Sequence, residues 1–142
     1  MREIKFKALI KNECFGGDYI VNVDKIDFQN QEVWFRLPPI IHHRDFKDVE
    51  LLQWTGFKDV GGVEIYEGDI IERQGNESFR DMSLNSRGYV IFEDGAFTVE
   101  RREHKVLWNK GKYLPYLDWP NEAFENCKVI GNKSLNPELL ED

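Results

Sequence analysis

Residues 88–99, GYVIFEDGAFTV, carry the local signal that most restricts how this chain can fold. Apolar residues alternate along both flanks of Asp94-Gly95, and Asp-Gly is a preferred dipeptide for a two-residue hairpin loop. That loop length fixes the register of the two strands. It pairs Phe92 with Phe97 and Val90 with Val99 on one face, and Ile91 with Thr98 on the other. We therefore expect a β-hairpin whose Phe and Val face belongs to the core.

The first fifty residues predict a small β-meander. Apolar residues at 4, 6, 8 and 10 alternate with neighbours on the other face, a period typical of a half-buried strand. Residues 19–23, 26–28 and 33–37 are further strand candidates, separated by turn-forming residues. Pro38-Pro39 is expected to stop the last strand, because proline cannot donate to a ladder. Residues 40–50 are interpreted as polar and irregular.

Short elements are expected elsewhere as well. Residues 127–131 predict a final strand, and Asn136-Pro137 is typical of a cap followed by one helical turn. A second short helix is expected at 120–126, and 74–87 is a polar loop. Thr55-Gly56 and residues 59–62 are interpreted as turns. Many short strands with glycine turns and little helix favour a mainly β fold, a small barrel or a sandwich.

Composition excludes some classes of function. No apolar run approaches the roughly 18 residues that cross a bilayer, and the first ten residues lack the hydrophobic region of a signal peptide. We expect a cytoplasmic protein. A net charge of −7 opposes a broad grip on phosphates. Cys14 and Cys127 follow no metal-ligand spacing and are expected to be inert packing residues in a reducing cytosol.

The candidate chemical groups are weak. His42, His43 and Asp45 carry zinc-ligand atoms, but adjacent residues of an extended chain point to opposite sides, so one metal rarely takes both histidines. Three acids, Glu64, Glu67 and Asp69, lack the spacing of a calcium loop. They are expected to be solvated or bonded to backbone amides near a turn. No nucleophile elbow, metalloprotease helix or phosphate loop occurs. We predict no catalytic residue, no metal and no cofactor.

A longer segment, QWTGFKDVGGVEIYEGDII at 53–71, resembles the signature of the YopX family, small proteins encoded by bacteriophages and prophages. The opening MREIKFKALI and the ending VIGNKSLNPELLED also resemble that family. The matching positions thus occur at three places in the right order and span nearly the whole chain. The matching motif residues include Gln53, Thr55, Gly56, Gly62, Ile65, Tyr66, Gly68, Asp69 and Ile70.

The resemblance implies a fold more than a function. It implies a β-rich N-terminal element, which we place at 1–48, followed at 49–142 by an SH3-like barrel with a C-terminal strand and a short helical turn. The motif residues are then expected to be structural, with Gly56, Gly62 and Gly68 in turns and Ile65, Tyr66 and Ile70 in core contacts. The family name implies no established activity.

Three functions follow as hypotheses. The first is a non-enzymatic phage or prophage accessory protein in the host cytoplasm that binds a host or phage protein through Trp54, Tyr66 and the 74–87 loop. The second is nucleic-acid binding through a basic segment comprising Arg101, Arg102, Lys105, Lys110 and Lys112. The third is an enzyme that uses the acids of the motif. Strand edges of the meander also leave a homo-oligomer open.

Overall fold

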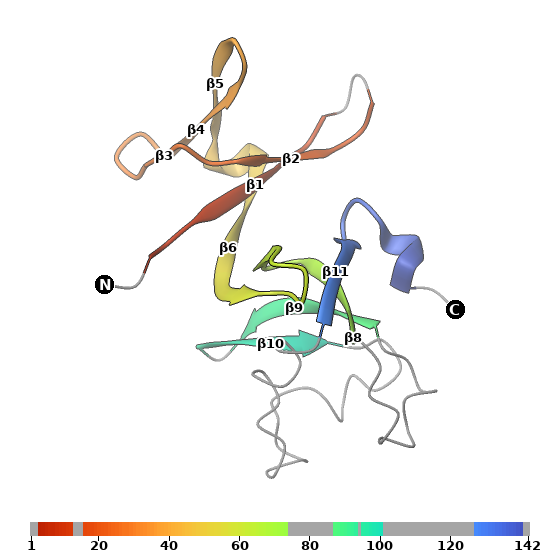
Figure 1. Cartoon of the computed structure of the whole chain (residues 1–142). Helices are drawn as coiled ribbons and strands as arrows, with labels where there is room; N and C mark the ends of the chain where they lie inside the picture. Colours follow the sequence, from red (N-terminus) through yellow and green to blue (C-terminus); the bar gives the residue numbers. More distant parts are fainter. Residues whose placement is uncertain (1–2, 13–15, 74–86, 94, 101–126, 141–142) are drawn as a thin grey trace, which may run out of the picture. The chain divides into compact units, whose positions relative to one another are not determined.

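The protein is described by a computed structural model in which residues 3–12, 16–73, 87–93, 95–100 and 127–140 are placed (Figure 1). These residues form strands and two short 3-10 helices, so the prediction of a mainly β fold is confirmed. The chain divides into two compact units, residues 1–54 and 55–142. The domain boundary expected after residue 48 stays a prediction. No helix in the described part of the chain is long and apolar enough to cross a membrane.

The first unit contains two antiparallel sets of strands. In one, β1 (Phe6–Ile10) pairs with β2 (Tyr19–Asn22) on one side and with residues 49–53 of β6 (Val49–Lys58) on the other. The other runs in the order β3 (Lys25–Asp27), β4 (Glu32–Leu37) and β5 (Ile40–Asp45). The 3-10 helix η1 (Phe46–Asp48) joins β5 to β6.

One core joins the two sets of strands of the first unit. Its buried members come from β1, β2 and β4, namely Ala8, Ile10, Val21, Val33 and Phe35. Phe35 is fully buried. Full burial of a side chain of this size stabilises a fold by about 1.5–3 kcal/mol relative to exposure. The alternation read in residues 33–37 therefore identifies the buried face of β4.

The expectation that residues 40–50 are irregular is wrong. Residues 40–45 form β5, whose register with β4 runs from Leu37 opposite Ile40 to Glu32 opposite Asp45. Pro38-Pro39, joined by a cis peptide bond, does end β4 as predicted. The same two residues also reverse the chain, because Leu37 and Ile40 face each other directly across them. The strand escaped detection because its apolar residues stand at the tip and its remainder is polar.

The second unit contains a four-stranded antiparallel sheet in the order β10-β9-β8-β11, which Figure 1 shows as a curled surface. Its strands are β8 (Asp69–Arg73), β9 (Arg87–Glu93), β10 (Ala96–Glu100) and β11 (Cys127–Asn132). The short β7 (Glu64–Tyr66) lies beside β6. The core of this unit comprises Ile65, Ile71, Val90, Val99 and Cys127.

The hairpin predicted at 88–99 is confirmed in register. Phe92 faces Phe97, Val90 faces Val99, and Ile91 faces Thr98 across β9 and β10. The expectation that this whole face is buried is wrong for Phe92, which is 49% exposed. Its ring packs edge-on against that of Phe97, with 4.9 Å between centroids. The face thus passes from core to surface towards the hairpin loop.

The predicted turns are confirmed in part. Gly62 and Gly68 lie in turns with positive φ, at 84° and 85°. Gly56 also has a positive φ, but Thr55 and Gly56 lie inside the continuous strand β6, so the turn expected there is wrong. The strand continues through Gly56 because the Thr55 side chain hydrogen-bonds to the neighbouring strand β7, as described below.

At the C-terminal end, both predicted elements are confirmed. β11 includes residues 127–131, and the short 3-10 helix η3 (Pro137–Leu140) occupies the place of the helical turn. The helix expected at 120–126 and most of the 74–87 loop lie outside the described residues.

Candidate interaction surface

The apolar residues at 65–71 of the 53–71 motif lie in the interior of the second unit. Ile65 and Ile70 are fully buried, and Tyr66 is 5% exposed. Thr55 is also buried, and its Oγ1 donates a hydrogen bond to the Ile65 carbonyl at 2.8 Å while accepting one from the Phe57 amide. Gln53 is half-buried and pairs with Phe6 in the first unit. These side chains stabilise the fold and are withdrawn from solvent.

The turn at Gly68 connects three segments of the second unit. Its amide donates to the Val90 carbonyl at 2.8 Å, and its carbonyl accepts from the Lys133 amide at 2.9 Å. Beside it, Asp69 is buried and its Oδ2 accepts the Tyr66 amide at 2.8 Å. Glu64 accepts the Tyr66 hydroxyl at 3.4 Å. Among these acids, the Asp69 carboxylate acts as a backbone acceptor, as expected for an acid near a turn.

Asp59 connects a turn to the last strand, a role that its interpretation as a turn residue did not reveal. Its Oδ1 accepts the amides of Gly61 and Val63, and its Oδ2 accepts the amide of Val129 on β11. Burial by itself raises the pKa of this carboxyl, but the three amide hydrogen bonds outweigh burial and hold the pKa of Asp59 below its usual value. The charged side chain therefore fixes the glycine-rich turn against the last strand.

The C-terminal motif has a similar structural role. Asn132 is buried and its Oδ1 accepts the amides of Ser134 and Leu135, while Asn136 Oδ1 accepts the Asn132 amide. A Cβ at Gly131 would lie 2.8 Å from both Asn136 Oδ1 and Leu139 Cδ1. Only glycine allows this approach. The motif thus closes the turn after β11.

Cys127 packs in the core of the second unit and is 1% exposed. Burial, with a smaller contribution from the charge of Asp59, raises the pKa of the Cys127 thiol to about 12. The packing role predicted for Cys127 is therefore confirmed by its burial, and since the thiolate is the nucleophile we expect it to be unreactive at neutral pH. Cys14 lies outside the described residues.

The residues expected to bind a partner are less completely described. Trp54 is half-buried, and the ammonium of Lys5 lies over its ring at 4.6 Å from the centroid. The basic segment, Arg101, Arg102, Lys105, Lys110 and Lys112, lies outside the described residues, as does the loop up to residue 86. The partner surface named from the sequence stays a prediction.

A different surface is evident at the end of the β4–β5 hairpin. Residues 37–41, here called the hairpin tip, read Leu-Pro-Pro-Ile-Ile and are all exposed. Leu37 is 41%, Ile40 57% and Ile41 63% exposed. Among the described residues this is the longest continuous run of exposed apolar side chains. Soluble proteins rarely leave contiguous apolar patches in water without a binding role. Its sequence signal was five consecutive apolar residues between Arg36 and His42.

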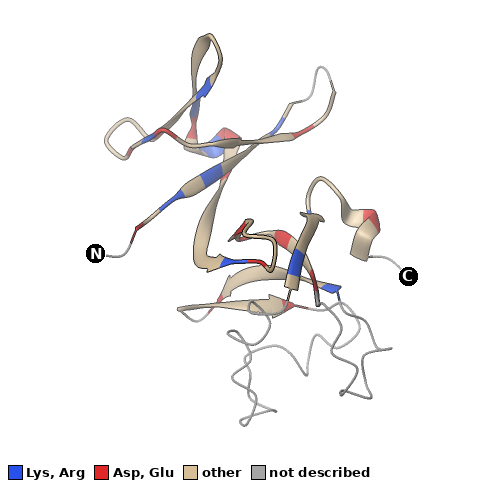
Figure 2. Ribbon diagram, in the orientation of Figure 1, with Lys and Arg blue, Asp and Glu red and all other residues tan. Residues whose placement is uncertain are grey.

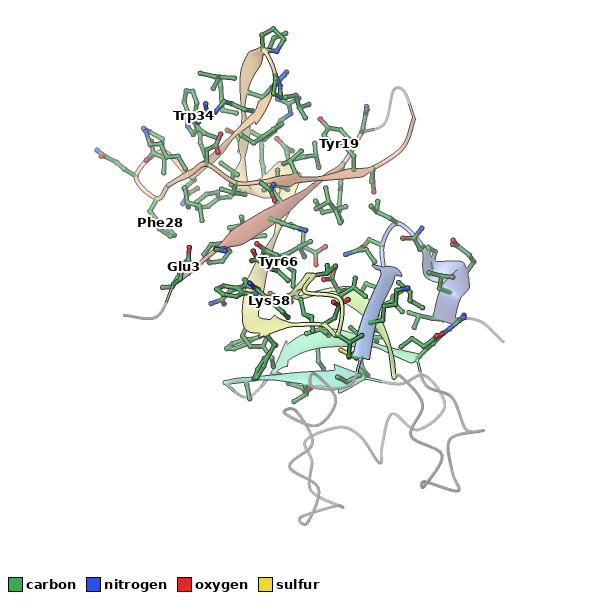
Figure 3. All side chains as sticks on the ribbon, viewed as in Figure 1. Glu3, Tyr19, Phe28, Trp34, Lys58 and Tyr66 are labelled. Carbon is green, nitrogen blue, oxygen red and sulfur yellow. The ribbon has the colours of Figure 1, made fainter. Side chains whose placement is uncertain are left out.

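Rings and cations rigidify the base of this hairpin. On one face of the sheet lies Trp34, labelled in Figure 3. His43 stacks on it with 4.8 Å between centroids, and Lys25 Nζ lies 5.5 Å from the same ring. On the other face, His42 stacks on Phe35 at 5.4 Å. The prediction that the two histidines point to opposite sides is confirmed. Each imidazole therefore packs on a β4 ring on its own face of the β4–β5 pair.

The β4–β5 hairpin carries charges of both signs, Arg36 and Arg44 against Glu32 and Asp45, and Figure 2 shows blue and red segments on it. Arg36 pairs with Asp24 at 3.1 Å, and the Arg44 guanidinium lies over Phe35, 5.7 Å from the ring centroid. Within the described residues, no group of three histidine, cysteine or acidic side chains could hold a metal ion. The arrangement is suited to contact between surfaces, with an apolar tip on a base whose rings stack across β4 and β5.

Comparison with known proteins agrees with the motifs and the fold. A search of curated proteins finds no match. The crystal structure of protein EF1440 from Enterococcus faecalis is similar in fold, with a TM-score of 0.57 and 23% identity over 98% of this chain and 99% of that one. The profile of the YopX protein family matches residues 9–141. This chain belongs to the YopX family.

Proposed function

We propose that this protein is a non-enzymatic interaction module that docks on another protein through the hairpin tip. The observation that carries the proposal is the continuous exposure of residues 37–41 at the end of a hairpin whose base is ordered by ring stacking. Apolar anchors on a rigid support lose little conformational entropy on binding, which favours their use at interfaces.

Family membership supports a broader setting for this role. The YopX resemblance favours a phage or prophage accessory protein acting in the host cytoplasm. The curled sheet β10-β9-β8-β11 supports assignment of the second unit to the SH3-like barrels. In this proposal the second unit is a scaffold, since its motif residues Thr55, Ile65, Tyr66 and Ile70 are buried, and the exposed tip of the first unit makes the contact.

The test is recovery of a partner with matched variants. Tagged full-length protein is used for affinity capture from infected bacterial cells, with and without nuclease. The Ile40→Ser, Ile41→Ser double variant should lose the captured protein. The control is Val60→Ser, Val63→Ser, which removes two side chains that are 56% and 50% exposed in the second unit. That control should capture the partner as the unaltered chain does.

Two results would contradict the proposal. Equal capture by the tip variant and the unaltered chain would show that the tip makes no contact. Recovery only of nucleic acid, or of proteins lost on nuclease treatment, would instead favour the basic segment at 101–112. Binding through that segment would weaken steeply with salt, because each phosphate contacted releases counterions.

A further inference from the structure

The backbone of β5 has an orientation that follows from two hydrogen bonds. Phe46 N donates to the Gln31 carbonyl at 2.8 Å, and Asp24 N donates to the Trp34 carbonyl at 2.9 Å. The amide and carbonyl of Trp34 therefore point towards β3. The residue opposite Trp34 on β5 is His43. Since residues of an antiparallel strand alternate in direction, His43 directs its own groups away from β4.

The same alternation assigns every residue of β5. Ile40, His42 and Arg44 bond to β4, whereas Ile41, His43 and Asp45 present their amides and carbonyls outward. β5 stands at the end of the order β3-β4-β5. In the described part of the chain, no backbone carbonyl accepts a hydrogen bond from these outward amides. An exposed strand edge of this kind is a template for pairing with another chain.

Arg44 covers this edge in the free protein. Its Nη1 donates to the outward carbonyl of His43 at 2.8 Å. Within the described residues no ion pair neutralises the Arg44 guanidinium. An incoming strand needs the His43 carbonyl for its own ladder, and this would free the guanidinium to bind a carboxylate. Backbone pairing thus favours an extended strand, and the charge of Arg44 favours one that carries an acidic residue.

We propose that β5 binds an extended segment of a partner protein by strand addition, and that this segment combines apolar and acidic residues. Its apolar residues would lie beside Ile40 and Ile41, and a carboxylate beside Arg44, since the His43 ring already has Glu32 within 4.0 Å. This inference rests on the proposed function, since it specifies how the hairpin binds. Main-chain bonds would give affinity and the alternate side chains specificity, as in other strand-addition complexes.

A displayed library of random 12-residue peptides, selected on the full-length protein, provides the probe. The expected result is enrichment of extended peptides whose apolar residues cluster towards one end and whose acidic residues cluster towards the other, to match Ile40 and Ile41 at one end of β5 and Arg44 near the other. Peptides without acids, or no enrichment at all, would overturn the inference. The best peptide is then synthesised and its Kd measured against variants of β5.

The discriminating variant is Ile41→Pro, which keeps an apolar side chain but removes an outward amide. Proline is tolerated at an edge position whose amide faces solvent. We expect the Kd of the peptide to rise about tenfold or more, because one ladder bond is lost and an acceptor of the peptide is left unpaired. The matched control, Ile41→Val, keeps the amide and should change Kd less than about threefold.

Charge provides an independent test. Arg44→Glu should weaken binding of the acidic peptide about fivefold or more at low salt, and should leave a peptide without acids unaffected. Should Ile41→Pro disturb the fold, amide exchange on the unaltered chain replaces it. The amides of Ile41 and His43 should exchange fast in the free protein and slowly with peptide bound.

Each failure has a distinct meaning. Unchanged affinity in Ile41→Pro, with loss of the captured protein in the Ile40→Ser, Ile41→Ser variant, would refute strand addition while leaving the tip as a contact. Self-association of the chain that Ile41→Pro abolishes would refute the choice of a foreign segment and assign the edge to a second copy.

Discussion

Asp59 accepts a hydrogen bond from the backbone amide of Val129 at 2.9 Å, across 70 residues of sequence. The same carboxylate holds the turn between β6 and β7 through Gly61 and Val63. A single side chain thus joins two of the segments through which the chain resembles its family. This hydrogen bond gives both segments a role in stabilising the fold. The candidate binding surface is therefore sought on the first unit.

Replacing Asp59 by asparagine should destabilise the second unit. Asparagine keeps one oxygen for Gly61 and Val63, but turns an NH2 group towards the Val129 amide, so two donors face each other in a buried site. We expect the free energy of unfolding to fall by about 1–3 kcal/mol. Urea denaturation measures this. The exposed Asp48→Asn is the control and should change stability by less than about 0.5 kcal/mol.

Stability should also decline in acid through this group. The pKa of Asp59 is lowered in the folded state, against a usual value of 3.8. Its contribution is therefore present above pH 3.8 and is lost as pH falls through the folded pKa. Denaturation at a series of pH values should show a smaller acid loss in Asp59→Asn. A parallel loss in both proteins would show that Asp59 does not contribute.

Gly131→Ala should weaken the closing turn after β11. The added Cβ would meet Asn136 Oδ1 and Leu139 Cδ1 at 2.8 Å, so the turn must shift. We expect thermal denaturation to show a loss of about 1–3 kcal/mol. Gly61→Ala, where the nearest atom is 3.4 Å away, serves as the control and should be tolerated. Equal stability of the two variants would contradict the packing described here.

Cys127 should resist alkylation in the native protein. Its thiol is buried, with a pKa of about 12, so little thiolate exists at pH 8. In a Cys14→Ser background, iodoacetamide should label the protein slowly until urea unfolds it, which mass spectrometry can follow. Rapid, complete labelling of the folded chain would show that the site is open.

The parts of the fold that were predicted correctly have local causes. The register of Val90 with Val99 follows from a two-residue loop, and the burial of Phe35 follows from alternation within one strand. The strand β5 was missed because its extended conformation depends on pairing with β4, where Trp34 lies opposite His43. Exposure of Phe92 depends on where the hairpin leaves the core, which alternation alone does not specify.

The candidate surface was harder to predict than the fold. Asp59 reads as a turn residue, since its partner Val129 lies on a strand far along the chain. The hairpin tip was interpreted as a strand end because proline stops a ladder. The same prolines reverse the chain and leave five apolar residues exposed together. Signals that depend on a turn and on distant pairing are not visible in a local window.

Photo-cross-linking in infected cells tests the central claim most directly. A photoreactive amino acid is placed at position 40, in the hairpin tip, or at position 63, an exposed apolar position of the second unit. The account predicts a discrete protein adduct from position 40 and none from position 63. An adduct from position 63 alone, or no adduct from position 40, would contradict the claim that the hairpin tip is the binding surface.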